Sequence, residues 1–564
     1  MQALEFIQNI ELPEPNLKRL TFCDSAKPQR VEEWASNLRA TRVLTTSSYL
    51  YEALPEVSRL KCSAQTRVEI LEILRPYAQH CIETLSKSFL NQPISLPEDA
   101  KKAAIVAQSL QKSMIDGYIQ AVKSCLIEKR QKQTSSPYFA LSLHRAITGY
   151  GLLFYRSYQI YSQAPKGLWL ALHSLFKIAD SFELLDTQHR DPIQLRPVQT
   201  SIQIAYMRII LMATSRVNQL NQKDIGALYQ AFAEWASPVN FRLGISDVNE
   251  SFYCVNLNKD FGAQYKSRIG DSEQDDLIIE LDFAPLLLQI GKQTKDHHGG
   301  FANEKSIGVP RNVSKAALAH VIDTLSNAAL RRQERRPTQS TAEICIGLTD
   351  AHAYLSNGIS FDEQIAELSR DSAIQDTLSS GFTPRSSHDK EAPIDHHKYR
   401  ISVQNVSQGG YCLLWEGDSS LKIESGELIG LKEFGHKSWS IGVVRWIRQR
   451  RAGSQLGILL LSDRCKSAAI AQMYDMGGYA DYVRALYIPR SKIYDEPETI
   501  LCPNIPFDEL DKVKLILDKE VLNAKLEKRL LNAGSIQRLS FRATTAANND
   551  DNERERKAPT RDEW

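Results

Sequence analysis

The chain contains 564 residues, which is too many for one ordinary hydrophobic core, so we expect roughly two to four domains. Hydrophobic residues make up 42% of the sequence and charged residues 24%, as is typical of a globular protein. The formal net charge of +2 is close to neutral, so the overall charge favours no general role in polyanion binding. The nine cysteines are scattered without a C-x-x-C pair, which argues against a disulfide framework and a structural zinc site.

The sequence shows no pattern from which a secretion signal or a membrane-spanning segment would be expected. The N-terminus has no basic region followed by a long apolar stretch, so no signal peptide is expected. The longest apolar run, Ile204–Ala213, is well below the length of about 18 residues that a transmembrane helix needs, and it contains Arg208. We therefore expect a cytoplasmic protein without membrane insertion.

Residues 1–28 are interrupted by prolines and are expected to form an extended N-terminal segment, followed by a helical domain over residues 29–240. Apolar residues three and four positions apart, such as Val68 and Leu71, predict these helices. Pro76 is expected to kink or split one of them. The other predicted helices are Ala103–Leu126, Tyr138–Gln163, Gly167–Leu185, Pro197–Val217 and Lys223–Trp235.

Residues 241–330 read as a mixed α/β connecting region. Asn249–Leu257 and Asp276–Phe283 have the length and apolar content of strands. Ser314 can cap a helix that runs from about Lys315 to Arg331.

Residues 331–465 have a β pattern that suits a barrel or a sandwich. A strand-like run extends from Ala342 to Leu355, and a polar insertion occupies residues 357–397. Residues 466–542 are expected to be a small C-terminal β-rich unit, in which 466–500 lead to a hairpin-like end, and residues 543–564 a disordered tail. The predicted strands of the central region are Ala342–Leu348, Tyr399–Val403, Tyr411–Trp415, Gly426–Leu431, Ile441–Ile447 and Leu456–Leu461.

A run of arginines precedes these strands. Arg331, Arg332, Arg335 and Arg336 form an R-x-x-x-R element in two registers. Guanidinium groups make paired hydrogen bonds to phosphate oxygens and to guanine, and they stack on purine rings. The alternative is a solvated helix end, where arginines favour the helix dipole.

A second motif follows the insertion. Asn405, Ser407, Gly409 and Gly410 form an N-x-S-x-x-G element between two apolar runs, which predicts a strand, a turn and a strand. Three further apolar segments follow: Tyr411–Trp415, Gly426–Gly430 and Ile441–Ile447, the last containing the letters GVVRW.

Both motifs and the strand succession resemble those of PilZ domains, small bacterial β-barrels that bind cyclic di-GMP. The resemblance implies a six-stranded PilZ-like barrel over residues 331–465, with an insertion at 357–397. The fold class is then α+β and multidomain: an all-α N-terminal domain, the PilZ-like barrel and the small C-terminal β unit.

The resemblance also implies a ligand, cyclic di-GMP, and no cofactor is expected. We expect no metal site, because no ligand spacing supports one, and no catalytic residue, because neither a nucleophile elbow nor a pair of carboxylates can be recognised. Arg331, Arg332, Arg335 and Arg336 would hold its phosphates and guanines. Asn405 and Ser407 would supply polar contacts, and Gly409 and Gly410 would let the backbone turn closely under the ligand.

We therefore expect a cytoplasmic second-messenger receptor that signals to an unidentified protein partner, with motility, pilus or biofilm control as candidate processes and no role in nucleic-acid binding. Binding is expected to order the arginine stretch. The alternative is an interaction scaffold whose degenerate barrel binds no nucleotide. A metal-dependent phosphoesterase built on the D-H-H triplets at 296–298 and 395–397 is disfavoured because supporting acidic motifs are absent. The chain is not expected to be an enzyme.

Overall fold

The computed structural model of the protein forms two compact units. The first comprises residues 1–331 with the short segments 417–422 and 448–451, and the second comprises the other residues from 332 to 564. Within the described ranges, every helix is too short or too polar to cross a lipid bilayer. The structure describes residues 2–8, 10–39, 41–127, 137–193, 199–244, 253–270, 277–296, 308–326, 335–356, 358–365, 396–416, 421–450, 452–474, 477–490, 496–517 and 520–544.

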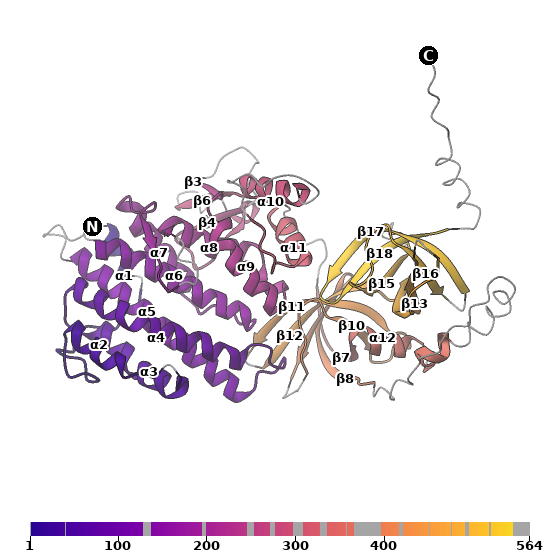
Figure 1. Ribbon diagram of the computed structural model, residues 1–564, viewed down its shortest axis with the longest axis horizontal. Coiled ribbons are helices and arrows are strands. Elements are labelled where there is room, and N and C mark those ends of the chain that lie inside the picture. Colours follow the sequence, from indigo (N-terminus) through magenta and orange to yellow (C-terminus); the bar gives the residue numbers. More distant parts are fainter. Residues whose placement is uncertain are drawn as a thin grey trace, which may run out of the picture. The chain divides into compact units, whose positions relative to one another are not determined.

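The first unit begins with the predicted helical domain (Figure 1). One difference from the sequence prediction is α1, which is a helix inside the segment expected to be extended. The helices are α1 (Gln2–Gln8), α2 (Pro28–Ser36), α3 (Val43–Arg59), α4 (Ala64–Phe89), α5 (Glu98–Ile127), α6 (Pro137–Gln159), α7 (Leu168–Ser181), α8 (Ile202–Thr214) and α9 (Gln222–Trp235). Two short strands that were not predicted, β1 (Gln188–Arg190) and β2 (Gln199–Ser201), pair antiparallel between α7 and α8.

Close packing of α4, α5 and α6 forms the centre of this domain. Gly117 of α5 faces Leu71 of α4, and a Cβ atom at Gly117 would come within 2.8 Å of the leucine side chain. Gly149 of α6 faces Ile115 of α5 in the same way, at 2.6 Å. The missing side chains therefore let three long helices approach one another more closely than larger residues would permit.

Pro76, which was expected to kink or split a helix, does not split it. Pro76 lies inside α4, which continues to Phe89. Leu74 and Ala78 on either side of the proline are fully buried, so the apolar face packs through this position. Tertiary burial along this face outweighs the lost backbone hydrogen bond.

A small mixed region completes the first unit. The strands β3 (Asn240–Leu243), β4 (Tyr253–Asn256), β5 (Gln264–Tyr265) and β6 (Ile278–Asp282) form an antiparallel sheet in the order β3-β6-β4-β5. The helices α10 (Ala284–Asp296) and α11 (Lys315–Ser326) follow. The predicted cap of α11 is confirmed, because the backbone N–H of Ala317 donates to Ser314 Oγ at 3.0 Å.

The second unit contains the predicted six-stranded barrel, which is closed in the order β10-β11-β12-β9-β8-β7. Val403, Leu413 and Leu456 are cross-strand partners on adjacent strands and are almost fully buried, so they face the barrel interior. The strands are β7 (Arg336–Ile346), β8 (Tyr399–Ser407), β9 (Gly410–Trp415), β10 (Leu428–Glu433), β11 (Ser440–Arg450) and β12 (Gly453–Ser462).

The strand-like run that was expected to reach Leu355 instead ends at Ile346, and α12 (Gly347–Leu355) follows it. Gly347 has a φ of +84°, a left-handed conformation that ends the strand at little cost only for glycine. Ala351 of α12 is buried in a cluster that includes Leu428 of the first barrel and Leu486 of the next domain. Because α12 is in contact with both barrels, it carries many apolar residues, and its sequence therefore resembles a continuation of the strand before it.

The C-terminal region is a second closed barrel rather than the expected hairpin-like end. Its strands β13 (Lys466–Gln472), β14 (Val483–Ile488), β15 (Thr499–Pro503), β16 (Lys512–Leu517), β17 (Glu520–Ala533) and β18 (Ile536–Ala543) close in the order β13-β14-β15-β18-β17-β16. Strands β13 and β14 and the start of β15 lie in residues 466–500, which were expected only to connect. Strand β13 consists mostly of alanine and serine, which carry little β propensity, so its pattern was missed.

The described start of the insertion packs on this second barrel. Phe361 and Ile365 lie against Ala469 and Ile516. Residues 366–395 of the insertion and 545–564 of the tail lie outside the described residues. The domain boundaries inferred from the sequence stay predictions.

Candidate functional site

The register of β7 and β8 brings the two sequence motifs together. Arg336, the first residue of β7, lies directly opposite Val406, and Pro337 lies opposite Asn405. Because Val406 stands between Asn405 and Ser407, the arginine element ends beside the N-x-S sequence. The long insertion that separates the motifs in the chain therefore does not separate them in the fold.

Two of the four predicted arginines, Arg331 and Arg332, lie outside the described residues. Arg335 and Arg336 are exposed, and neither forms an ion pair with a carboxylate in the part of the chain that the structure describes. The pairing of β7 and β8 is irregular just after Pro337, before it resumes at Ser340. Such irregularities redirect side chains at strand ends. Two cations therefore stand at this end of the barrel, available to an anionic ligand.

Asn405 lies on the outer face of the barrel. Its partner across the strand pair is Cys412, next to Leu413, which faces inward opposite Val403. Successive residues of a strand point to opposite faces, so Cys412 and Asn405 face outward. Ser407, two residues beyond Asn405, shares this face, and both side chains are half-buried. A ligand at the outer surface can therefore reach an amide and a hydroxyl together.

The turn after Ser407 is shaped by the neighbouring strand β12. A Cβ atom at Gly410 would lie 1.9 Å from the carbonyl oxygen of Ile458, and its φ of +153° is rare for other residues. The backbone N–H of Leu460 donates to the Gly409 carbonyl at 3.0 Å. The Ser407 hydroxyl donates to the Gly410 carbonyl at 3.3 Å. Strand packing by itself thus requires glycine at position 410, whether or not a ligand is bound.

Trp446 belongs to the same face, and the sequence reasoning did not select it. A Cβ atom at Gly457 would lie 2.1 Å from two atoms of the Trp446 indole, so the ring rests directly on this glycine. Gly457 is the cross-strand partner of Cys412, which is the partner of Asn405. The partly exposed ring of Trp446, which belongs to β11, therefore lies over β12, two strands away from β8 and Asn405. The letters GVVRW predicted only a strand.

A tyrosine on β9 is hydrogen-bonded to a carboxylate on β10. The Tyr411 hydroxyl donates to Glu433 Oε1 at 2.8 Å. Burial, together with the hydrogen bond to Glu433 and its charge, raises the pKa of Tyr411 well above its usual value, so the hydroxyl keeps its proton. Tyr411 is the cross-strand partner of Val406, which pairs with Arg336. Glu433 is therefore engaged by a neutral donor rather than by the arginines.

The D-H-H triplets do not form a metal centre in the described residues. His396 Nδ1 lies 2.9 Å from Asp350 Oδ1, whereas Asp395, His297, His298 and His388 lie outside the described residues. Across the described ranges, no group of three or more histidine, cysteine, aspartate or glutamate side chains could hold a metal ion.

Comparison with known families accounts for most of the chain. The model described as "Cyclic-di-GMP receptor FimW, N-terminal domain" matches residues 29–244. The model "Cyclic-di-GMP receptor FimW, middle PilZ domain" matches residues 252–382 and 369–467. The model "FimW C-terminal beta-barrel domain" matches residues 468–544. These matches correspond to the helical domain, the first barrel with the region before it, and the second barrel.

One relative matches over nearly the whole length. The protein named "Cyclic-di-GMP receptor FimW" from Pseudomonas aeruginosa is 26% identical over 580 aligned positions, which cover 96% of this chain and 94% of the relative. No solved structure shows a significant match. The two motifs on adjacent strands, the closed six-stranded barrel and the three consecutive matches lead to one conclusion: this chain belongs to the PilZ-domain family.

Proposed function

We propose that this protein is a receptor for cyclic di-GMP, bound on the outer surface of the first barrel. The pairing of Arg336 with Val406 carries this proposal, because it sets the arginine element beside Asn405 and Ser407. The name of the Pseudomonas relative supports the same ligand.

Each motif has a role that suits the ligand. Cyclic di-GMP has two phosphates and two guanines, and guanidinium groups recognise both. Arg335 and Arg336, together with Arg331 and Arg332, hold phosphate oxygens and guanine edges or faces. The Asn405 amide and the Ser407 hydroxyl add short hydrogen bonds on the barrel side.

The protein signals by binding rather than by turnover, acts in the cytoplasm and passes the second-messenger level to a protein partner. Control of motility, pili or biofilm formation is the process we propose for it. To test whether the protein binds cyclic di-GMP without turning it over, the protein is incubated with cyclic di-GMP and Mg²⁺ or Mn²⁺, and the nucleotide is analysed by chromatography. Recovery of intact ligand is expected, and a linear dinucleotide product would contradict a purely binding role.

Titration calorimetry with cyclic di-GMP tests the site. The full chain is compared with a variant in which Arg331, Arg332, Arg335 and Arg336 are replaced by alanine. Each lost paired contact costs about 1–3 kcal/mol, so binding should fall by at least about a hundredfold. Arg542→Ala is the matched control, because this exposed arginine belongs to the second barrel and pairs with Glu527.

Two smaller changes locate the ligand on the barrel. Asn405→Ala and Ser407→Ala each remove one polar group from the outer face, and each should weaken binding without changing the circular dichroism spectrum. If cyclic di-GMP binds all of these variants as tightly as the wild type, the ligand site does not include these residues. If the wild-type protein does not bind cyclic di-GMP, the interaction scaffold becomes the better reading.

A further inference from the structure

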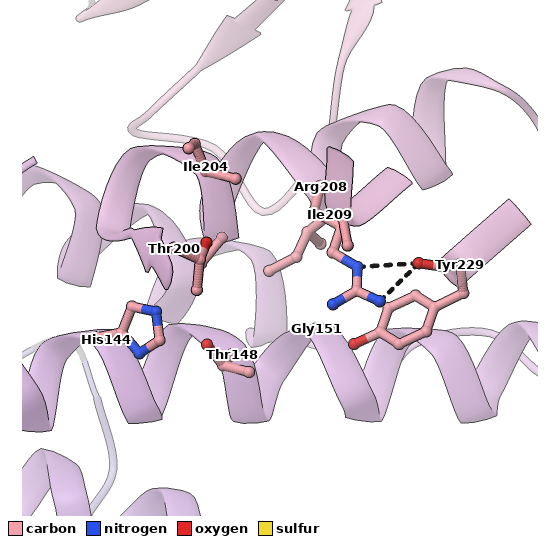
Figure 2. A pocket seen from close by; sticks show the side chains of 10 residues that line it. His144, Thr148, Gly151, Thr200, Ile204, Arg208, Ile209 and Tyr229 are labelled. Carbon is pink, nitrogen blue, oxygen red and sulfur yellow. Dashed lines mark hydrogen bonds between the residues drawn. The ribbon is translucent and has the colours of Figure 1, made fainter. Parts of the chain in front are cut away.

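A cavity in the helical domain lies among α6, α8, α9 and β2 (Figure 2). The centre of a water-sized sphere can reach about 30 Å³ of its interior. His144, Thr148 and Gly151 line it from one face of α6, because residues four and three positions apart share a helix face. Arg208 of α8 and Tyr229 of α9 line the other side.

Two of the residues that line this cavity carry buried polar atoms without partners. Both ring nitrogens of His144 and the hydroxyl of Thr148 are buried without a hydrogen-bond partner, and His144 is fully buried. Next to His144, Arg145 Nη1 and His189 Nε2 are also buried and unpartnered, and the two histidine rings lie 5.0 Å apart. Buried polar groups in native proteins nearly always have a partner. This cluster therefore points to a polar ligand.

Arg208 supplies a positive charge to the cavity. Its Nε and Nη2 atoms both donate to the Tyr229 carbonyl, at 3.0 and 2.6 Å, and its guanidinium lies 3.7 Å from the centre of the Tyr229 ring. These contacts hold one edge of the guanidinium in place. Figure 2 shows the third nitrogen on the side away from this carbonyl. Arg208 forms no ion pair with a carboxylate of the described residues.

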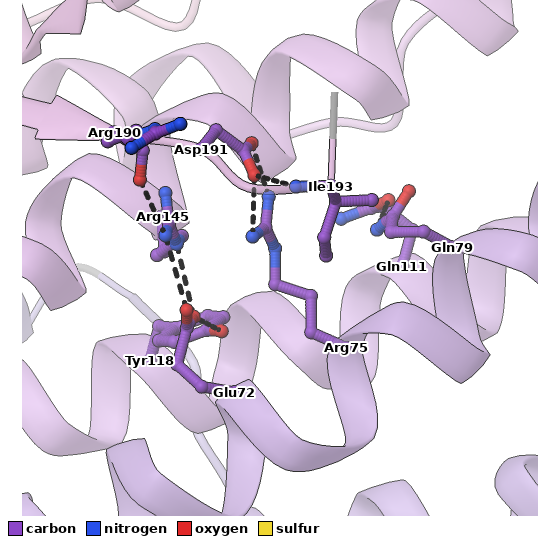
Figure 3. Close-up of polar contacts among 9 residues, drawn as sticks. All are labelled: Glu72, Arg75, Gln79, Gln111, Tyr118, Arg145, Arg190, Asp191 and Ile193. Carbon is purple, nitrogen blue, oxygen red and sulfur yellow. Dashed lines mark hydrogen bonds and ion pairs between the residues drawn. The ribbon is translucent and has the colours of Figure 1, made fainter. Parts of the chain in front are cut away.

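Two carboxylates beside Arg145, the neighbour of His144, are already engaged by arginines (Figure 3). Glu72 accepts from Arg145 at 3.0 and 3.2 Å, and Asp191 pairs with Arg75. Burial, helped by the charge of Arg145, lowers the pKa of His144 to about 3. The imidazole is therefore neutral near pH 7, with one N–H donor to offer. In the part of the chain that the structure describes, no carboxylate lies within ion-pair distance of Arg208 to offset its charge.

We propose that this cavity binds a small oxyanion the size of a carboxylate group, held by His144, Thr148 and Arg208. Donors and an uncompensated cation favour an anion over a neutral ligand. The volume suits a group of about two water molecules, which excludes a nucleotide. This site is separate from the proposed cyclic di-GMP site and does not depend on it.

Formate is the probe that tests the proposal. The thermal unfolding of the full chain is followed by circular dichroism in sodium formate and in sodium chloride of equal ionic strength, and calorimetry measures formate affinity. Formate should raise the melting temperature above the chloride value and bind once per chain. Equal melting temperatures in the two salts would overturn the proposal, because the cavity then holds water or an adventitious ion only.

Three variants tie the effect to the cavity. Thr148→Val keeps the side-chain shape but removes the hydroxyl, which should weaken formate binding about tenfold or more. Gly151→Ala places a Cβ atom between Ile209 and Tyr229 and should abolish binding by filling the space. Ser174→Ala is the control, because its buried hydroxyl is also unpartnered but does not line the cavity.

The variants are interpreted only after their spectra and their cyclic di-GMP affinity match those of the wild type. Unchanged formate binding in both Thr148→Val and Gly151→Ala would overturn the proposed site. If both variants misfold, Arg208→Lys takes their place, and it should weaken formate binding by the loss of the fixed guanidinium edge. Full formate affinity in Arg208→Lys would also contradict the proposal.

Discussion

Replacing Asp191 with alanine should strongly destabilise the helical domain. Arg75 of α4 donates from both terminal nitrogens to the two carboxylate oxygens of Asp191, at 2.9 and 2.5 Å. The side chains of Arg75 and Asp191 are only 8% and 3% exposed. The variant therefore leaves the Arg75 guanidinium buried without the partner that holds both of its terminal nitrogens.

The expected loss follows from this burial. Removing one partner of a buried ion pair costs about 3–5 kcal/mol, because the remaining charge cannot return to water. In a domain of about 200 residues, each kcal/mol lowers the melting temperature by about 2–4 °C. The melting temperature of the helical domain should therefore fall by roughly 6–20 °C in Asp191→Ala.

Far-UV circular dichroism measures this change, because nearly all described helices lie in the first unit. The matched control is Glu33→Ala, which breaks the Arg30–Glu33 pair at 2.6 Å, with side chains 63% and 62% exposed. An exposed pair contributes little, so the control should melt close to the wild type. Equal losses in the two variants would refute the reasoning from burial. Replacing Arg75 and Asp191 together with Met and Leu should recover much of the loss.

Three further outcomes are expected. Gly410→Ala should destabilise the first barrel by about 1–3 kcal/mol in chemical denaturation, because the new Cβ would collide with the Ile458 carbonyl. Gly291→Ala is the control, because an added Cβ at Gly291 would have no atom within 4 Å, and it should be neutral or stabilising by up to about 1 kcal/mol. Equal losses of stability in Gly410→Ala and Gly291→Ala would contradict the packing argument. Burial alone would raise the pKa of Asp191, but the hydrogen bond and charge of Arg75 outweigh it and hold the pKa below its usual value. This stabilisation is complete above the unfolded pKa of about 3.9 and is lost as pH falls through the folded pKa, so acid below about pH 4 should lower the melting temperature of the wild type more than that of Asp191→Asn. Cyclic di-GMP should change tryptophan fluorescence in the wild type but not in Trp446→Phe, and an unaltered response in that variant would remove Trp446 from the binding face.

Elements with a strong local pattern were predicted closely from the sequence. Helix α6 was expected at 138–163 and runs over 137–159, and α9 was expected at 223–235 and runs over 222–235. Both have apolar faces at helical spacing, which depend only on neighbouring residues. Strand β13 was missed because its alanines carry no strand signal until the barrel closes around them.

The candidate site was predicted in its parts but not in its arrangement. The N-x-S-x-x-G letters predicted a strand, a turn and a strand, and β8 and β9 confirm that structure. The ligand contacts of Asn405 and Ser407 stay predictions. Trp446 was missed because its place over Gly457 depends on the pairing of strands that are distant in the sequence.

The sequence by itself determined the class of each region, the family resemblance and the residues of both motifs, because periodicity, turn chemistry and motif letters are local properties. Only the tertiary structure decided what those residues face. The register of β7 against β8 places Arg336 opposite Val406 across a long insertion. The Arg75–Asp191 pair and the cavity at His144 likewise join helices and strands that are far apart in the chain. Such contacts depend on how the whole chain packs, and no short stretch of sequence encodes them.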